Sequence, residues 1–174
     1  MFKLYYAPGT CALASHIALE EAGAPYSAER LSFKENQQNS ADYLKVNPKG
    51  RVPALVTDKG VLTETPAILA FIAQSFPNAK LAPTDAFAFA QVQSINSYLC
   101  STVHVAHAHK MRGTRWATEE SSFADFQRFL RTDRQFYAQS AEELVLRYSE
   151  TAKRADGQLP RLFASSPRLL AAPR

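Results

Sequence analysis

The alternation of strand-like and helix-like segments in the first 76 residues is the feature that most constrains the fold. Residues 2–6 alternate and are rich in aromatic side chains, which predicts a half-buried strand. Residues 7–10 contain a proline and a glycine and end the strand. The alanine-rich segment 12–22 then predicts a helix that Gly23 ends. A chain that begins in this way favours an α/β unit over an all-helical one.

The next segments continue the alternation. Residues 26–33 predict a second strand, and the polar stretch after it holds one short helix near 41–45. Residues 52–57 and 61–64 predict two strands joined by a turn at 58–60. The pattern therefore predicts a small unit with a mixed sheet.

From here the chain becomes helical. Thr65 is a good N-cap and Pro66 suits the first helical position, which predicts a helix through Phe76. Residues 77–83 are the expected linker. From Asp85 apolar residues recur at helical spacing: Phe87, Val92, Ile95, Leu99, Val103 and Ala106. A second helix is predicted from Phe123 to Lys153.

Composition and charge exclude several classes of protein. With 46% apolar and 21% charged residues, no long apolar run and no signal-peptide core at the start, we expect a cytoplasmic protein with no membrane contact. Two cysteines make neither a disulfide framework nor a thiolate zinc site. Residues 1–126 carry 11 basic and 11 acidic groups, so we expect no nucleic-acid partner.

Cys11 stands where a loop becomes a helix. The unpaired N–H groups at a helix start favour a thiolate, which could attack a disulfide or another electrophile. The alternative is a small hydrophobic side chain packed under the helix. Because Ala14 stands where a resolving cysteine would lie, any redox chemistry would need an outside thiol.

Two other segments could bind a ligand. A cis bond at Val52-Pro53 would turn the Val52 backbone groups outward toward an extended peptide-like ligand; an ordinary trans proline at a strand edge is the alternative. The helix start at Thr65 suits a carboxylate and Glu64 beside it suits an ammonium, so together they fit an α-amino-acid head group. A helix cap beside a solvated glutamate is the alternative here.

These segments, in this order and spacing, resemble the bacterial cysteine-type (beta class) glutathione transferases. The likeness is carried by residues 3–19, 47–55, 62–68 and 96–104, and extends over about residues 1–126. It implies a thioredoxin-like N-terminal domain followed by an all-helical domain.

The resemblance also implies the domain bounds and the site. Residues 1–78 would form the glutathione-binding domain and residues 86–174 the helical domain, shortened or altered after about residue 126. Cys11 and His104 would be catalytic. Glutathione would contact Cys11, Val52, a cis Pro53, Glu64, Thr65, Ser97, Ser101 and His104.

The function implied is conjugation of glutathione to hydrophobic electrophilic small molecules, with thiol-disulfide exchange through Cys11. We expect a homodimer, no metal and no cofactor besides glutathione as co-substrate; His107 and His109 beside His104 make a weak metal pattern. A non-catalytic glutathione-binding or regulatory protein on the same fold is the alternative, and a catalytically dead truncation is another.

The chain departs from the family pattern at two places. No residue is assigned to the glycyl carboxylate of glutathione, although Lys34 or Gln37 could serve. Residues 127–174 carry the whole net charge of +4 and lack the capping box expected before a buried helix. That segment is a shortened natural variant, a shifted reading frame or a wrongly assigned sequence.

Overall fold

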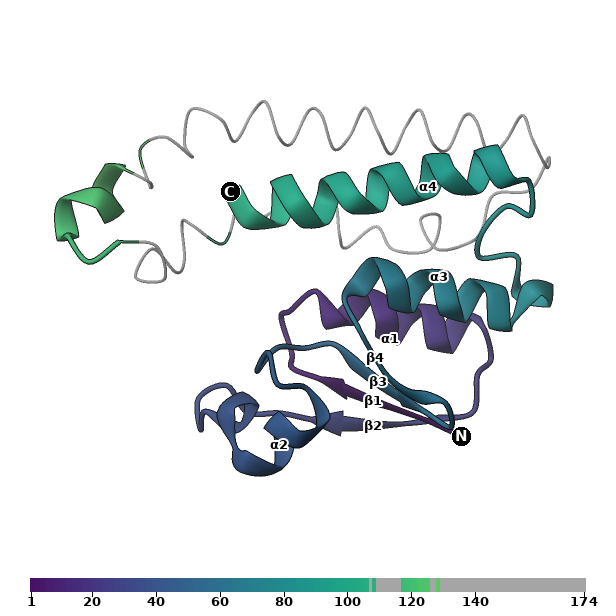
Figure 1. Ribbon diagram of the computed structural model, residues 1–174, viewed down its shortest axis with the longest axis horizontal. Helices are drawn as coiled ribbons and strands as arrows, with labels where there is room; N and C mark the ends of the chain where they lie inside the picture. The colour runs from purple at the N-terminus through teal and green to yellow at the C-terminus, as the bar shows by residue number, and fades with distance from the viewer. Residues whose placement is uncertain (107, 109–116, 126–127, 129–174) are drawn as a thin grey trace. The chain divides into compact units, whose positions relative to one another are not determined.

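The computed structural model describes residues 1–106, 108, 117–125 and 128, which fall into two compact units divided between Asp85 and Ala86. Each unit is described by itself (Figure 1). Most of the helix predicted from Phe123 to Lys153, and nearly all of the altered segment 127–174, lie outside the described residues.

The first unit alternates strand and helix as the sequence predicts. Its elements are β1 (Phe2–Tyr6), α1 (Ala12–Glu21), β2 (Tyr26–Arg30), η1 (Gln37–Asn39), α2 (Ala41–Val46), β3 (Ala54–Thr57), β4 (Gly60–Thr63), α3 (Thr65–Ser75) and η2 (Pro77–Ala79). The thioredoxin-like α/β fold expected for this part of the chain is confirmed.

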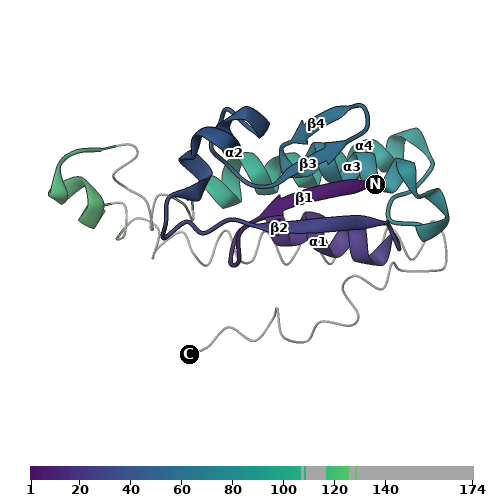
Figure 2. The same cartoon turned by 90° about the horizontal axis from the view of Figure 1, so that it is seen from below.

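The sheet of this unit has the strand order β2-β1-β3-β4 within residues 1–85 (Figure 2). β1 is parallel to β2 and antiparallel to β3, and β3 is antiparallel to β4. Tyr5 lies opposite Ala54, and Ala54 lies opposite Thr63. The end of β1, the start of β3 and the end of β4 therefore meet at one edge of the sheet, so the loops that leave these points are neighbours.

Two apolar clusters hold the sheet between its helices. α1 and α3 lie together on one side of the sheet and α2 on the other (Figure 1). The larger cluster joins the sheet to α1 and α3 through Leu4, Ala18, Leu19, Leu55, Ile68 and Ile72. The other includes Tyr43 of α2 and Val52. Burying each large aliphatic side chain contributes about 1.5–3 kcal/mol, so this packing fixes the frame on which the loops stand.

The start of α3 differs from the prediction. The N-cap residue is Glu64, and Thr65 is the first helical residue rather than the cap. Glu64 has a positive φ of 70° and its carbonyl accepts the N–H of Ile68 at 3.1 Å. The helix thus begins one residue earlier than its sequence signal, which places the Glu64 carboxylate at the helix N-terminus.

Two strands are shorter than predicted. The strand expected at 26–33 ends at Arg30. The strand expected at 52–57 begins only at Ala54, because Pro53 has no N–H to give to the sheet.

The described part of the second unit is mostly helical, as predicted, and residues 117–119 are not in a helix. α4 (Ala86–Tyr98) is followed by one π-helical segment, η3 (Leu99–Val103), and residues 104–106 continue in helical geometry. Within the part of the chain that the structure describes, no helix combines the length and the hydropathy that a membrane crossing requires.

Candidate functional site

One edge of the sheet gathers three of the segments that the sequence singles out. The loop that leads into Cys11 follows β1, Val52-Pro53 precedes β3, and Glu64-Thr65 follows β4. Since those strand ends are paired in register, Cys11, Val52 and Glu64 belong to one side of the first unit.

The Cys11 thiol lies at the start of α1. Cys11 is exposed, and its Sγ donates to the carbonyl oxygen of Val52 at 3.7 Å. The loop before it is held by the Thr10 hydroxyl, which donates to the Ala7 carbonyl at 2.7 Å and accepts the N–H of Ala12 at 3.3 Å. The structure therefore brings two of the predicted residues together and excludes the alternative of a cysteine packed under the helix.

The Val52-Pro53 bond is cis, as the resemblance implies. The residue before it is fixed by two donors: the Tyr43 hydroxyl and the Asn47 amide nitrogen each lie 2.6 Å from the Arg51 carbonyl oxygen. Burial raises the pKa of Tyr43, so its hydroxyl keeps the proton that it donates.

The loop between α2 and β3 closes on itself around Asn47. Asn47 is 1% exposed, its side-chain oxygen accepts the N–H of Lys49 at 3.2 Å and its carbonyl accepts the N–H of Gly50 at 3.0 Å. Gly50 has φ of +60°, and a Cβ there would lie 2.7 Å from the side-chain oxygen of Asn39. The backbone that leads to Val52 is therefore held by partly buried hydrogen bonds from Tyr43 and within the loop around Asn47.

Glu64 is bound by a residue that the sequence analysis did not single out. Lys49 Nζ lies 2.6 Å from Glu64 Oε1 and 3.0 Å from the Thr63 hydroxyl. The side chains of Lys49 and Glu64 are 52% and 65% exposed. Thr65, by contrast, is buried. The Glu64 carboxylate is thus an exposed acceptor that already binds an ammonium group.

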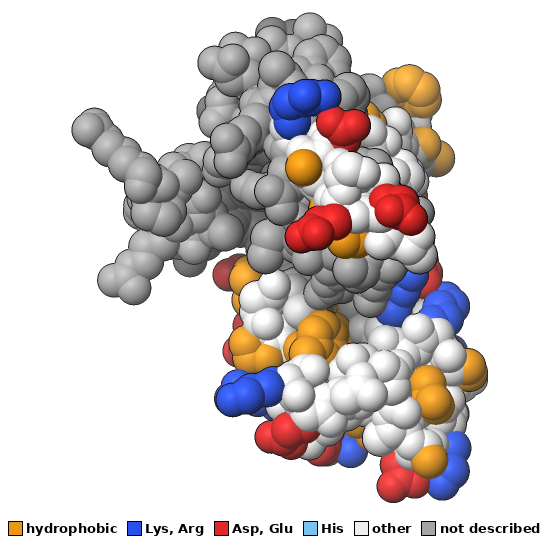
Figure 3. All heavy atoms as spheres, turned by 90° about the vertical axis from the view of Figure 1, so that its left-hand side faces the viewer, with side chains coloured by type: hydrophobic (Ala, Val, Ile, Leu, Met, Phe, Trp, Pro, Cys, Tyr) orange, Lys and Arg blue, Asp and Glu red, His pale blue; other side chains and the backbone are white. Residues whose placement is uncertain are grey.

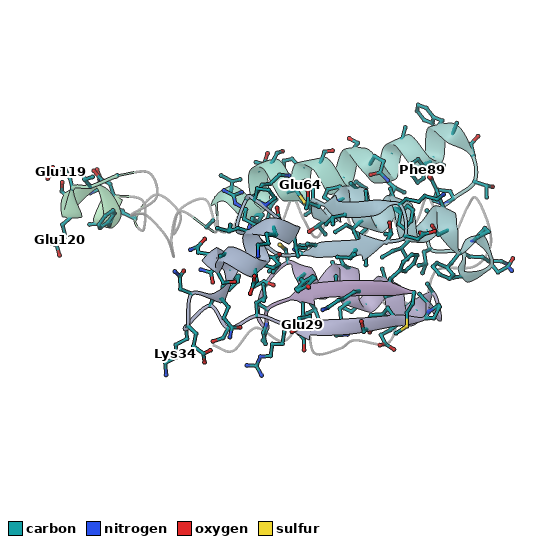
Figure 4. All side chains as sticks on the ribbon, turned by 60° about the horizontal axis from the view of Figure 1, so that its bottom comes forward. Glu29, Lys34, Glu64, Phe89, Glu119 and Glu120 are labelled. Carbon is teal, nitrogen blue, oxygen red and sulfur yellow. The ribbon has the colours of Figure 1, made fainter. Side chains whose placement is uncertain are left out.

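The resemblance leaves two residues that could bind the glycyl carboxylate of glutathione, Gln37 and Lys34, and their contacts differ. The side chain of Gln37 is engaged: its oxygen accepts the Ser32 N–H at 2.8 Å and its nitrogen donates to Glu35 at 3.0 Å. Lys34 is exposed and projects from the outer end of its loop, well apart from Glu64 (Figure 4).

The remaining predicted residues belong to the second unit. Ser97 lies in α4, Ser101 in η3 and His104 just after it, and all three are exposed. The Ser101 hydroxyl lies 3.4 Å from that of Thr102. Their contribution to a site with Cys11 stays a prediction.

The charge on the first unit is mixed. On the face drawn in Figure 3, the Lys and Arg side chains are interspersed with Asp and Glu side chains rather than gathered by sign. Two ion pairs of the described residues in this unit join Lys3 to Glu29 at 3.1 Å and Lys45 to Asp42 at 2.9 Å.

Three residues of the site could not be assigned from the sequence. Tyr43 and Asn47 act through the Arg51 carbonyl, and Lys49 reaches Glu64 across 15 positions of the chain. The Asn47-Pro48 pair is a turn signal and could have indicated the loop. Nothing in the local pattern indicates the partner of Lys49.

Comparison with known proteins identifies relatives of this chain. Residues 1–74 match the family described as "Glutathione S-transferase, N-terminal domain". The chain is 40% identical over 105 residues to glutathione S-transferase GstA of Escherichia coli O157:H7, covering 59% of this chain and 52% of the relative. It spans about half the length of that curated relative.

Solved structures resemble the chain over more of its length. A glutathione transferase homologue from Sulfitobacter with bound glutathione is 43% identical, with a TM-score of 0.69, over 90% of this chain and 70% of that one. A bacterial beta class glutathione S-transferase from Sphingomonas chungbukensis is 32% identical, with a TM-score of 0.60, over 87% and 68% respectively.

Proposed function

Because the chain belongs to the glutathione S-transferase family, we propose that it binds glutathione at the edge formed by Cys11, Val52 and Glu64 and conjugates it to small hydrophobic electrophiles. The single observation that carries the proposal is the 3.7 Å contact between the Cys11 thiol and the Val52 carbonyl at a sheet edge that also holds Glu64.

The middle of the ligand is the cysteinyl residue of glutathione. Its peptide N–H would donate to the Val52 carbonyl, which now accepts from the Cys11 thiol. That exchange would bring the ligand's sulfur beside Cys11. The two donors on the Arg51 carbonyl support this role, because they fix the backbone before the ligand arrives.

The γ-glutamyl end of the ligand carries an ammonium and a carboxylate. The ammonium fits the exposed carboxylate of Glu64, as the bound Lys49 ammonium indicates. The carboxylate fits the N-terminus of α3 at Thr65, where no side chain among the described residues caps the helix.

The chemistry proposed is nucleophilic displacement. The glutathione sulfur, as thiolate, forms a bond to an electrophilic carbon while a leaving group departs with its electron pair, and the thiol proton passes to solvent. Ser97, Ser101 and His104 would contact the ligand from the second unit. The protein contributes mainly position and stabilisation of the thiolate.

A second reaction uses Cys11 itself. Its thiolate would attack the disulfide of oxidised glutathione, so that a Cys11–glutathione disulfide forms and one glutathione thiolate leaves. Cysteine at this position, together with the similarity to a beta class structure, supports the cysteine-type class.

Assembly and location complete the proposal. We propose a homodimer, as expected for this family, to be checked by light scattering during size-exclusion chromatography, where a monomeric mass would contradict it. The proposed location is the cytoplasm, where a free thiol such as that of Cys11 stays reduced. Glutathione is proposed as co-substrate, with no other cofactor.

The test uses the variant Cys11→Ala with Cys100→Ala as control. After treatment with oxidised glutathione, intact-mass measurement should show one glutathione adduct on the unmodified protein and on the control, and none on Cys11→Ala. All three should be retained on immobilised glutathione. Failure of the unmodified protein to bind the resin would overturn the proposal, and an adduct on Cys11→Ala would overturn the role of Cys11.

A further inference from the structure

Lys49 occupies the acceptor that the proposed ligand needs. Its Nζ lies 2.6 Å from Glu64 Oε1 and 3.0 Å from the Thr63 hydroxyl, so the Glu64 carboxylate is paired before any ligand binds. We propose that Lys49 determines specificity: it makes the site select a zwitterionic head group over one that carries an ammonium alone. The inference rests on the proposed function.

The backbone of Lys49 is held by its loop, while its side chain is half exposed and, among the described residues, bound only through its ammonium group. The Lys49 N–H donates to the buried Asn47 side chain, and the next residue, Gly50, has the positive φ that closes the loop. The Lys49 side chain is 52% exposed, and the Glu64 side chain that it contacts is 65% exposed. Its ammonium can therefore change partner without any shift of the loop.

A ligand ammonium that binds Glu64 must either displace the Lys49 ammonium or share the carboxylate with it. Sharing places two positive charges side by side, which repel each other. Displacement leaves the Lys49 ammonium beside the Thr63 hydroxyl, near the start of α3. An anion at that point would give the displaced ammonium a new partner.

An α-amino-acid head group brings that anion with it. Its carboxylate is bonded to the same carbon as its ammonium, so it reaches the start of α3 when the ammonium reaches Glu64. The head group thus exchanges one ion pair, Lys49 with Glu64, for two: ligand ammonium with Glu64, and Lys49 with ligand carboxylate. A head group without the carboxylate breaks the first pair and supplies no second one.

The experiment compares two probes by isothermal titration calorimetry. One is glutathione, and the other is γ-aminobutyryl-cysteinylglycine, which keeps the terminal ammonium and lacks the neighbouring carboxylate. The proteins are the unmodified chain, Lys49→Gln and the control Lys45→Gln, which breaks a more exposed Lys–Asp pair on α2.

We expect Lys49→Gln to reduce the preference for glutathione over the second probe by about two- to fivefold, the range of an exposed ion pair. The control should keep the preference of the unmodified protein. If Lys49→Gln only damaged the loop, the affinities for both probes would fall by the same factor and their ratio would stay unchanged. That result would overturn the inference. An equal rise in both affinities would overturn it as well. If the unmodified protein binds neither probe, the proposed function itself fails.

Discussion

Gly50 offers a sharp test of how the loop before Val52 is built, through the variant Gly50→Ala. Its φ of +60° is a conformation in which a Cβ costs about 1–2 kcal/mol. The added Cβ would also lie 2.7 Å from the Asn39 side-chain oxygen and 3.2 Å from the Gln38 carbonyl oxygen. The Asn39 amide is not free to turn, because its nitrogen donates to Asn36 at 2.6 Å.

The cost of the close contacts can be separated from the cost of the backbone conformation. Gly23 also has φ of +60°, and a Cβ there would meet nothing within 4 Å. Gly23→Ala should therefore lower the free energy of unfolding by about 1–2 kcal/mol. Gly50→Ala should lower it by about 1–3 kcal/mol more, because the site is overpacked and one hydrogen bond is broken.

Urea unfolding followed by far-UV circular dichroism measures both variants under the same conditions. Glutathione affinity of the folded protein gives a second readout, and it should fall in Gly50→Ala and stay unchanged in Gly23→Ala. Equal losses of stability in the two variants would refute the reasoning, since they would show that the loop around Gly50 has room for a methyl group.

Two further predictions concern polar groups. Asn47→Ala leaves the Lys49 N–H without its acceptor and removes one of two donors to Arg51, so urea unfolding should show a loss of about 1–3 kcal/mol; an unchanged midpoint would contradict this. Burial and the hydrogen bond to Glu20 raise the pKa of Tyr26 from 10.0 to about 12, so the folded chain keeps a proton that the unfolded chain loses in this window. Stability should therefore fall between pH 10 and pH 12 more steeply in the unmodified protein than in Tyr26→Phe, and parallel slopes would disprove it.

The main frame of the first unit follows from local pattern. β1 and the start of α1 lie where aromatic alternation and the alanine-rich run predict them, because burial and helix propensity act over a few residues. The start of α3 was misplaced by one residue because Glu64 adopts a positive φ, which is uncommon outside glycine and carries no sequence signal.

The local sequence pattern predicts only part of the candidate site. Cys11 and Glu64 stand at helix starts, so their sequence positions already indicate exposed groups beside free N–H donors. The pair of Lys49 with Glu64 depends on the register of β3 and β4, which brings distant loops together. Such contacts depend on tertiary structure, so the local sequence pattern does not predict them.

The two hydrogen bonds to the Arg51 carbonyl have a consequence for the ligand binding that we propose. Because the Tyr43 hydroxyl and the Asn47 amide already hold the backbone before Val52, that backbone loses little conformational entropy when a peptide pairs with it. For the proposed ligand, the rate of association should then depend on the rearrangement of side chains around the site, and the main chain from Asn47 to Val52 should keep one conformation before and after binding.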